Sequence, residues 1–351
     1  MTAGDPQLVV GGDQLTAVDE SPSRMLPIPG SRMFEINEAL KVYLGRNPDG
    51  VVFDASQGDG GASLPGVPTR LLEVAHRLQM EHGTGYDKPF GTPEFRRAVV
   101  EDYWQLDPDT GWGPTNVIAC QGGRDALIKA YDAVQFLGHG RWGDFVVASR
   151  VPWISYNWGP YAVGANVMLA PGDENRAWEL TPESIEACGD FASSLDGRKL
   201  ALLVVTSPDN PTGRSLAPER QIAIARAGFA AGVPFVLFDW IYHRVTDEQP
   251  HDLNAFLRAL EPEERERCIF LDGITKSLGA SNIRNCHLVA SEAVVKFIQS
   301  RASHAVIPTF FSQAVAIAAY REGFDQAAAE IVGPTNASRA VIGPFLSLIH
   351  I

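Results

Sequence analysis

Short apolar runs rich in β-branched residues alternate with longer helix-forming stretches from about residue 115 onward, and this alternation restricts the fold more than any other feature. The runs include NVIAC (116–120), DFVVASR (144–150), KLALLVVTS (199–207) and PFVLFDW (234–240). Because they are apolar at nearly every position, each strand is expected to be covered on both faces. Strands that alternate with helices in this way predict an α/β fold with a mostly parallel central sheet and helices on both faces.

The composition is that of a soluble globular enzyme or binding protein with one large and one smaller domain. Of the 351 residues, 45% are hydrophobic and 20% are charged, which is ordinary for such a protein. The formal net charge of −13, without any basic block, argues against nucleic acid or an anionic membrane as a partner. No signal peptide is evident, and no apolar run reaches the roughly 20 residues of a membrane span. A cytoplasmic protein is therefore expected.

The cysteines give no sign of a metal site or of a disulfide framework. Cys120, Cys188, Cys268 and Cys286 are scattered along the chain. None of them forms a C-x-x-C pair or has a histidine at metal-ligand spacing. They are predicted to be buried, reduced thiols, and no metal is expected.

Polar and special residues fall mainly just after the predicted strands, where open α/β sheets bind ligands. Gly122 and Gly123 precede a helix, so bare backbone N–H groups at its start offer an anion site, although an ordinary turn has the same composition. The tetrapeptide Asn210-Pro211-Thr212-Gly213 is a turn by composition. Asp239 ends an otherwise apolar strand, and it is equally well interpreted as a helix cap or as the partner of a buried cation.

A lone lysine, Lys276, follows the apolar run CIFLDGI (268–274), and Arg284 comes eight positions later. Most lysines in loops are simply exposed to solvent. The segment lacks the glycine that a phosphate-binding P-loop requires before its lysine, and the chain shows no G-x-G-x-x-G after a strand. Neither of these nucleotide-binding patterns is supported.

Taken in order, the motifs resemble those of the class I/II aminotransferases, the fold-type I enzymes that use pyridoxal 5′-phosphate (PLP). The resemblance runs from about residue 55 to residue 320. YDKPFGTPEFRRAV (86–99), NPTG (210–213) and DWIY (239–242) resemble family segments, and the Lys276-to-Arg284 interval equals that of the family's Schiff-base lysine and phosphate arginine. The resemblance implies the fold of PLP-dependent transferases, with a mostly parallel sheet and a small α+β domain.

The resemblance also implies roles for individual residues. Lys276 would form the Schiff base and shuttle a proton at the substrate Cα. Asp239 would keep the pyridine nitrogen protonated, while Asn210 and Tyr242 would hydrogen-bond the 3′ oxygen of the ring. The expected catalytic residues are thus Lys276, Asp239 and Tyr242, and Gly58 and Asn210 are expected to approach the substrate.

Further residues would bind the cofactor. Trp153 stands where the family has its stacking aromatic residue, although core packing is the alternative. Tyr156 and Trp158 could make the substrate pocket aromatic, but packing is the favoured use of both. Arg284 would clamp the phosphate beside the backbone of Gly123 and Arg124. Tyr86 would reach the phosphate of a neighbouring subunit, which implies a homodimer with shared active sites.

Three departures from the family pattern stand out. Gly273 occupies a position where the family often has a phosphate-binding serine, and Cys286 one where it usually has glycine. The family's arginine for the substrate α-carboxylate lies in the C-terminal small domain, and no counterpart follows Lys276 here. We therefore expect an incomplete small domain in a truncated chain, with an arm and part of the small domain at 1–60, the PLP-binding domain at 61–305 and the start of the C-terminal small domain at 306–351.

The leading functional prediction is amino transfer from an amino acid to a 2-oxo acid through Lys276. The same set of residues also supports elimination, replacement, or an oxidative or cyclising reaction of an amino acid. A non-catalytic PLP-binding module is a third alternative. The first 50 residues are too poor in basic side chains to form the DNA-binding domain that regulators built on this fold carry.

Overall fold

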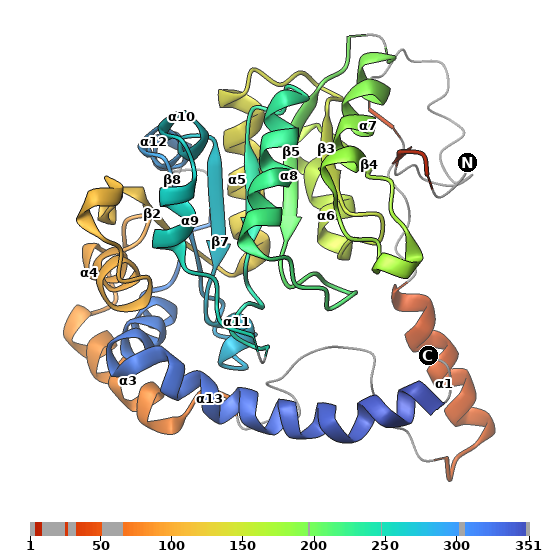
Figure 1. The fold of residues 1–351 in the computed structure, drawn as a ribbon. Helices are drawn as coiled ribbons and strands as arrows, with labels where there is room; N and C mark the ends of the chain where they lie inside the picture. The colour runs from red at the N-terminus through yellow and green to blue at the C-terminus, as the bar shows by residue number, and fades with distance from the viewer. Residues whose placement is uncertain are drawn as a thin grey trace.

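A computed structural model describes residues 4–8, 25–26, 33–50, 66–195, 197–246, 248–301 and 306–348. A single eight-stranded sheet lies at its centre, with the strand order β1-β4-β3-β5-β6-β7-β8-β2 (Figure 1). The strands are β1 Gln7–Leu8, β2 Val117–Cys120, β3 Phe145–Ala148, β4 Asn166–Leu169, β5 Leu200–Thr206, β6 Val236–Asp239, β7 Cys268–Asp272 and β8 Cys286–Ala290.

Helices cover both faces of the sheet, as predicted from its apolar strands. Side chains from α5, α6 and α12 pack on one face, and side chains from α3, α4, α7, α8, α9 and α13 pack on the other. The helices are α1 Met33–Arg46, α3 Thr69–His82, α4 Pro93–Ala98, α5 Gly123–Leu137, α6 Ile154–Trp158, α7 Pro182–Ser193, α8 Pro218–Ala230, α9 Leu253–Ala259, α10 Pro262–Arg265, α11 Ile274–Ser277, α12 Glu292–Arg301 and α13 Phe310–Leu348.

The strand directions determine which loops meet at the edge of the sheet. Strands β4, β3, β5, β6 and β7 run parallel to one another. Strand β8 is antiparallel to both β7 and β2, so the residues that precede β8 lie at the same edge as the residues that follow β2 to β7. Strand β1 is antiparallel to β4 and ends toward the opposite edge. The end of β2, the end of β7 and the start of β8 therefore converge.

The ends of the chain differ in part from expectation. Residues 1–60 are rich in Gly and Pro, which predicts an irregular segment, yet α1 forms a helix within them. The run GVVFDASQGD (50–59) predicts a strand, and it falls almost wholly outside the described residues. The run PTFFSQAVAIAAYREGF (308–324) predicts a helix, and α13 is present there; it packs against α3 and contains a non-helical kink at Gly323. Within the described part of the chain, no helix combines the length and the apolar character needed to cross a membrane.

A buried polar network lies behind the strand that leads to Lys276. The Asp272 carboxylate accepts hydrogen bonds from Tyr103 Oη at 2.5 Å and from His243 Nε2 at 2.8 Å. His243 can donate from Nε2 because its Nδ1 accepts from the backbone N–H of His251 at 3.0 Å. Burial alone would raise the pKa of Asp272, but His243 and Tyr103 outweigh it and hold that pKa below its ordinary value.

Asp272→Asn is expected to lower the free energy of unfolding at pH 7 by about 2 kcal/mol, because one buried donor loses its acceptor. The native pKa of Asp272 is lowered, so its contribution is present above the pKa of the unfolded carboxyl and is lost as the pH falls through the native value. Urea unfolding midpoints at pH 7 and pH 4 should show a gap between wild type and variant that narrows in acid. Glu292→Gln, which removes an exposed ion pair to Lys296, is the control and should change little. A gap that does not depend on pH would contradict this account.

Candidate active site

A cavity of about 450 Å³ opens at the edge of the sheet where these loops converge. Its volume lies within the range of roughly 300–1,000 Å³ that small-molecule sites occupy. The cavity contains most of the residues that sequence reasoning singled out. Its lining residues are Gly123, Arg124, Trp153, Tyr156, Asn210, Asp239, Ile241, Tyr242, Leu271, Thr275, Lys276, Ser281 and Arg284.

Lys276 reaches the cavity from α11, a single helical turn just after β7. Its Nζ lies 5.5 Å from the centroid of the Tyr242 ring. The turn is fixed at both ends, since Gly273 N donates to the Asp272 carboxylate at 2.7 Å and Thr275 Oγ1 donates to Asn285 O at 3.1 Å. The lysine is therefore placed by the strand end and not by a freely moving loop.

Arg284 faces the N-terminus of α5 across the cavity. Its Nη1 donates to Ser281 O at 2.9 Å, and its Nη2 donates to Gln121 O at 3.4 Å. Gly122 has φ +83, and a Cβ there would lie 2.4 Å from Arg284 Nη2, so only glycine allows this approach. The first N–H groups of the helix, with no side-chain cap, and the guanidinium together form a site for an anion.

Asp239 ends β6 and is almost completely buried. Burial raises the pKa of its carboxyl to about 6, although hydrogen bonds from Tyr156 and from the backbone of Ile241 act in the opposite direction. Tyr156 Oη donates to Oδ2 at 2.6 Å, and Ile241 N donates to Oδ1 at 3.1 Å. Asp239 is therefore ionised at neutral pH and can pair with a cationic group in the cavity.

Two further pairs of side chains line the cavity. Asn210 Nδ2 donates to Tyr242 Oη at 3.2 Å, so these two polar groups meet although they follow different strands. Trp153 packs edge-on against Tyr156, with ring centroids 5.5 Å apart. The guanidinium of Arg124 lies 5.9 Å from the centre of the Trp153 ring.

Two of the predicted site residues are not seen in this cavity. Tyr86 is fully exposed and does not line the cavity of its own chain. Gly58 lies outside the described residues. Conversely, sequence reasoning missed the roles of Thr275 and Ser281 as lining residues, and for Tyr156 it favoured packing over a place in the pocket. The available signal for Tyr156 was its spacing, since it follows Trp153 by three residues, about one helical turn.

The structure explains why Gly273 departs from the family's serine. A Cβ at Gly273 would lie 2.6 Å from Cys286 Cα and 2.9 Å from Asn285 O, which are both backbone atoms. The Cys286 thiol occupies adjacent space, 3.5 Å from Thr275 Oγ1. A hydroxyl near the cavity comes instead from Thr275, directly before Lys276.

Comparison with known proteins identifies the family. The model of the family "Aminotransferase class I and II" matches residues 48–334. Aspartate aminotransferase of Geobacillus stearothermophilus is 25% identical over 298 residues, which cover 85% of this chain and 70% of that protein. Aspartate aminotransferase of Bacillus subtilis is 24% identical over 263 residues, and the match spans 74% of this chain but only 63% of that protein.

Solved structures show the same fold. Aspartate aminotransferase from Thermus thermophilus with maleate has a TM-score of 0.73 at 21% identity, covering 92% of this chain and 79% of that one. Aspartate aminotransferase from Rhizobium meliloti has a TM-score of 0.74 at 20% identity, covering 92% and 76%. The chain belongs to the class I and II aminotransferase family, which confirms the predicted fold type, enzyme class and dependence on PLP.

The side chains present also suit this cofactor. The cavity offers a primary amine for an aldehyde, a buried carboxylate for a ring nitrogen, and an arginine beside a helix N-terminus for a phosphate. Within the described residues, no group of three or more His, Cys, Asp or Glu side chains is placed to hold a metal ion.

Gly273→Ser introduces the residue that the family often has. It is expected to lower the stability of the folded protein and not to improve phosphate binding. The new Cβ forces the backbone at Cys286 to move, at a cost of about 1–3 kcal/mol in the free energy of unfolding. The melting temperature and the affinity for PLP should both fall. Gly45→Ala in α1, where a Cβ meets no atom within 4 Å, is the control and should be neutral or slightly stabilising. A Gly273→Ser variant as stable as wild type would contradict this account, because the backbone at Cys286 would then move without a cost in stability.

Proposed function

We propose that the cavity around Lys276 is the aminotransferase active site of this chain and that it moves an amino group between an amino acid and a 2-oxo acid. The observation that carries the proposal is that Asp239, Lys276 and Arg284 line one cavity, although 45 positions separate Asp239 from Arg284 in the sequence. Elimination and the other PLP reactions use similar groups, but the curated relatives named above are all aminotransferases.

PLP supplies an electron sink for the charge that develops at the substrate Cα. The chain's own residues hold the cofactor and move the proton. Lys276 Nζ would be the covalent anchor and, once freed by the incoming amine, the base that takes the proton from Cα and delivers it to C4′ of the cofactor. Asp239 would pair with the ring nitrogen and keep it protonated.

The remaining lining residues orient the ring. Asn210 and Tyr242, which already contact each other, would hydrogen-bond the 3′ oxygen of the ring. Arg284 and the N–H groups of Gly123 and Arg124 would hold the phosphate. Trp153, which packs against Tyr156, would stack on the ring. Gly58, which lies outside the described residues, stays a proposed substrate contact.

The charges of the cavity suit a substrate carboxylate, and the relatives' names point to an acidic amino donor. Its described lining residues include three cations, Arg124, Lys276 and Arg284, against one acid, Asp239. The cofactor engages Lys276 and Arg284 directly, which leaves the Arg124 guanidinium for a carboxylate of the substrate. The relatives' names, and the maleate in the Thermus thermophilus structure, agree with this choice.

We infer a homodimer in which Tyr86 acts across the interface. Its side chain is fully exposed on its own chain, and Met80 and Phe311 are also exposed apolar residues on the nearby helices α3 and α13. The domain division at residues 60 and 305 and a cytoplasmic location remain part of the proposal. The four cysteines support a reducing location because all are buried and free.

The proposal for Lys276 is tested by loading the protein with PLP and reducing it with borohydride. Peptide mass spectrometry should find the phosphopyridoxyl group on Lys276, and Lys276→Ala should carry none and lose amino transfer by several orders of magnitude. Aspartate and glutamate, assayed with 2-oxo acids, should outperform alanine and phenylalanine as donors. Lys296, exposed on α12, gives the matched control in Lys296→Ala. Reduction onto another lysine would contradict the assignment.

A complementation experiment tests Tyr86. Tyr86→Ala and Lys276→Ala homodimers are each expected to be poorly active. Refolding them together should restore about one quarter of wild-type activity, because half of the dimers are mixed and each carries one complete site. If Tyr86 served its own chain, no mixed site would be complete and activity would stay low. Light scattering on the wild type establishes whether a dimer is present at all.

A further inference from the structure

A buried tyrosine at the wall of the cavity holds the Asp239 carboxylate. Tyr156 Oη donates to Asp239 Oδ2 at 2.6 Å, and Thr206 Oγ1 donates in turn to Tyr156 Oη at 3.0 Å. Both side chains are buried. We propose, on the basis of the function proposed above, that Tyr156 is the positioning residue of Asp239, backed by Thr206 and opposed by the nearby carboxyl of Asp209.

The direction of the hydrogen bonds follows from the chemistry of the three groups. Burial, reinforced by the nearby Asp239 carboxylate, raises the pKa of Tyr156 well above its ordinary value, so the phenol keeps its proton. It can therefore donate only to Asp239, and its lone pairs remain open to Thr206. A hydrogen bond to an ionised acceptor is shorter and stronger than a neutral one, which agrees with 2.6 Å. The tyrosine thus fixes the carboxylate without adding a charge.

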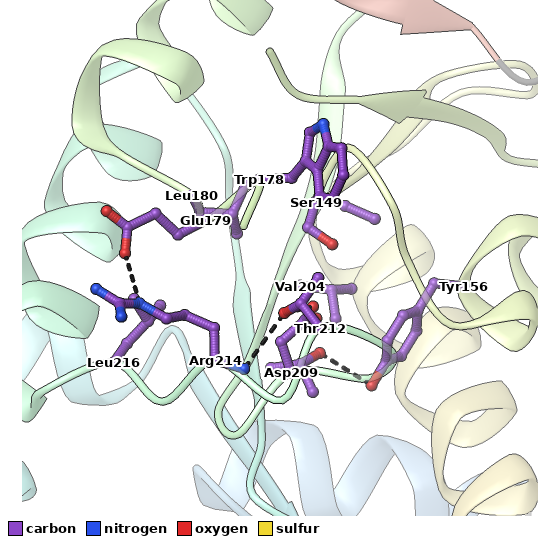
Figure 2. A pocket seen from close by; sticks show the side chains of 12 residues that line it. Ser149, Tyr156, Trp178, Glu179, Leu180, Val204, Asp209, Thr212, Arg214 and Leu216 are labelled. Carbon is purple, nitrogen blue, oxygen red and sulfur yellow. Dashed lines mark hydrogen bonds and ion pairs between the residues drawn. The ribbon is translucent and has the colours of Figure 1, made fainter. Parts of the chain in front are cut away.

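Asp209 lies across a small cavity behind Tyr156. This cavity has a volume of about 20 Å³ and is lined by Tyr156, Thr206, Asp209 and Thr212, among others. Figure 2 shows the Tyr156 hydroxyl pointing inward, toward the loop that carries Asp209 and Thr212. Thr212 Oγ1 donates to the Asp209 carboxylate at 2.7 Å. Asp209 directly precedes Asn210, so it lies on the loop that also lines the cofactor cavity.

The groups around Asp239 act on its protonation in opposite senses. The hydrogen bonds from Tyr156 and Ile241 favour the ionised carboxylate, whereas the negative charges of Asp272 and Asp209 disfavour it. Removing Tyr156 and removing the charge of Asp209 should therefore have opposite effects. Titratable groups on every neighbouring element interact electrostatically with Asp239: Tyr131 on α5, Tyr156 on α6, Asp209 after β5, Tyr242 after β6, Asp272 at the end of β7 and Cys286 at the start of β8. The cations Arg124, Lys276 and Arg284 line the same cavity as Asp239.

Tyr131 provides a matched control. Like Tyr156 it is a buried tyrosine beside Asp239, but its hydroxyl has no hydrogen-bond partner among the described residues. Tyr131→Phe removes a hydroxyl of the same kind from the same surroundings without removing a bond to the carboxylate. Any effect of Tyr156→Phe that is absent from Tyr131→Phe reports the hydrogen bond and not the loss of a buried hydroxyl.

The experiment measures the binding of pyridoxamine 5′-phosphate, which contains the ring nitrogen and the phosphate but forms no bond to Lys276. Its dissociation constant is followed by quenching of tryptophan fluorescence between pH 5 and pH 8.5. In the wild type, affinity should fall once the pH drops below about 6, where Asp239 takes up a proton. Tyr156→Phe should move that fall upward by about one pH unit, which makes binding at pH 6 several-fold weaker.

The other variants fix the sign of the effect. Asp209→Asn should move the fall in affinity to lower pH, because a repelling charge is gone, and Tyr131→Phe should leave it in place. Thr206→Val, which removes only the bond to the tyrosine hydroxyl, should move it upward by less than Tyr156→Phe does. It serves as the test if Tyr156→Phe fails to fold, as judged by circular dichroism.

Two negative outcomes have different meanings. If the wild type binds the ligand and the pH profiles of folded Tyr156→Phe and Thr206→Val coincide with it, the positioning role is refuted while the proposed function stands. If the wild type, in dimeric form, binds neither this ligand nor PLP, and Arg284→Ala does not differ from it, the proposed function itself fails.

Discussion

The reversed direction of β8 is the constraint on which the rest of the site depends. A parallel β8 would place Arg284, which precedes it, at the opposite edge of the sheet from Lys276. Because β8 runs antiparallel between β7 and β2, its first residues lie beside the end of both neighbours. The phosphate-binding end of the site and the lysine are thereby built from three adjacent strand ends, each held by main-chain hydrogen bonds of the sheet.

Two buried carboxylates, Asp239 and Asp272, lie on opposite faces of this sheet and have different roles. Asp239 faces the cavity, where the hydrogen bonds from Tyr156 and Ile241 offset its burial only in part, so its pKa is raised to about 6. Asp272 faces the opposite side, where Tyr103 and His243 satisfy it fully. A buried charge costs free energy unless it is paired. A cationic ring nitrogen would therefore pair with Asp239. Asp272, which already has its partners, links β7, the strand before Lys276, to the loop after Tyr242.

The sequence allowed much of this arrangement to be predicted, and the failures have identifiable causes. The strands and their ends could be located because runs such as 200–206 are apolar throughout and are followed at once by polar or turn residues. The direction of β8 could not be predicted, since a strand buried on both faces has the same pattern either way. The structure shows why it reverses: residues 273–285 form only the single turn of α11 and a short loop, too little for the helical crossover that a parallel pair needs.

The hydrogen bond between Tyr156 and Asp239 escaped sequence reasoning for another reason. Tyrosine packs well in any apolar environment, so its type alone gives no sign of a polar contact with a residue 83 positions away. The same applies to His243 and Asp272, which come together only because β6 and β7 are neighbours in the sheet. Pattern and propensity place residues along one element, whereas contacts between elements depend on the strand order.

Close packing around the phosphate end requires glycine at two positions, Gly273 and Gly122. The backbone of Cys286 leaves no room for a Cβ at Gly273, and the backbone of Gly122 has room for the Arg284 guanidinium only because it carries no side chain. Arg284 itself has φ +60, a conformation that costs a non-glycine residue free energy. Its guanidinium is held there by Ser281 O and Gln121 O. An arginine kept in a strained backbone conformation by its side-chain contacts is already oriented toward the helix N-terminus, so little ordering remains to be done when an anion binds.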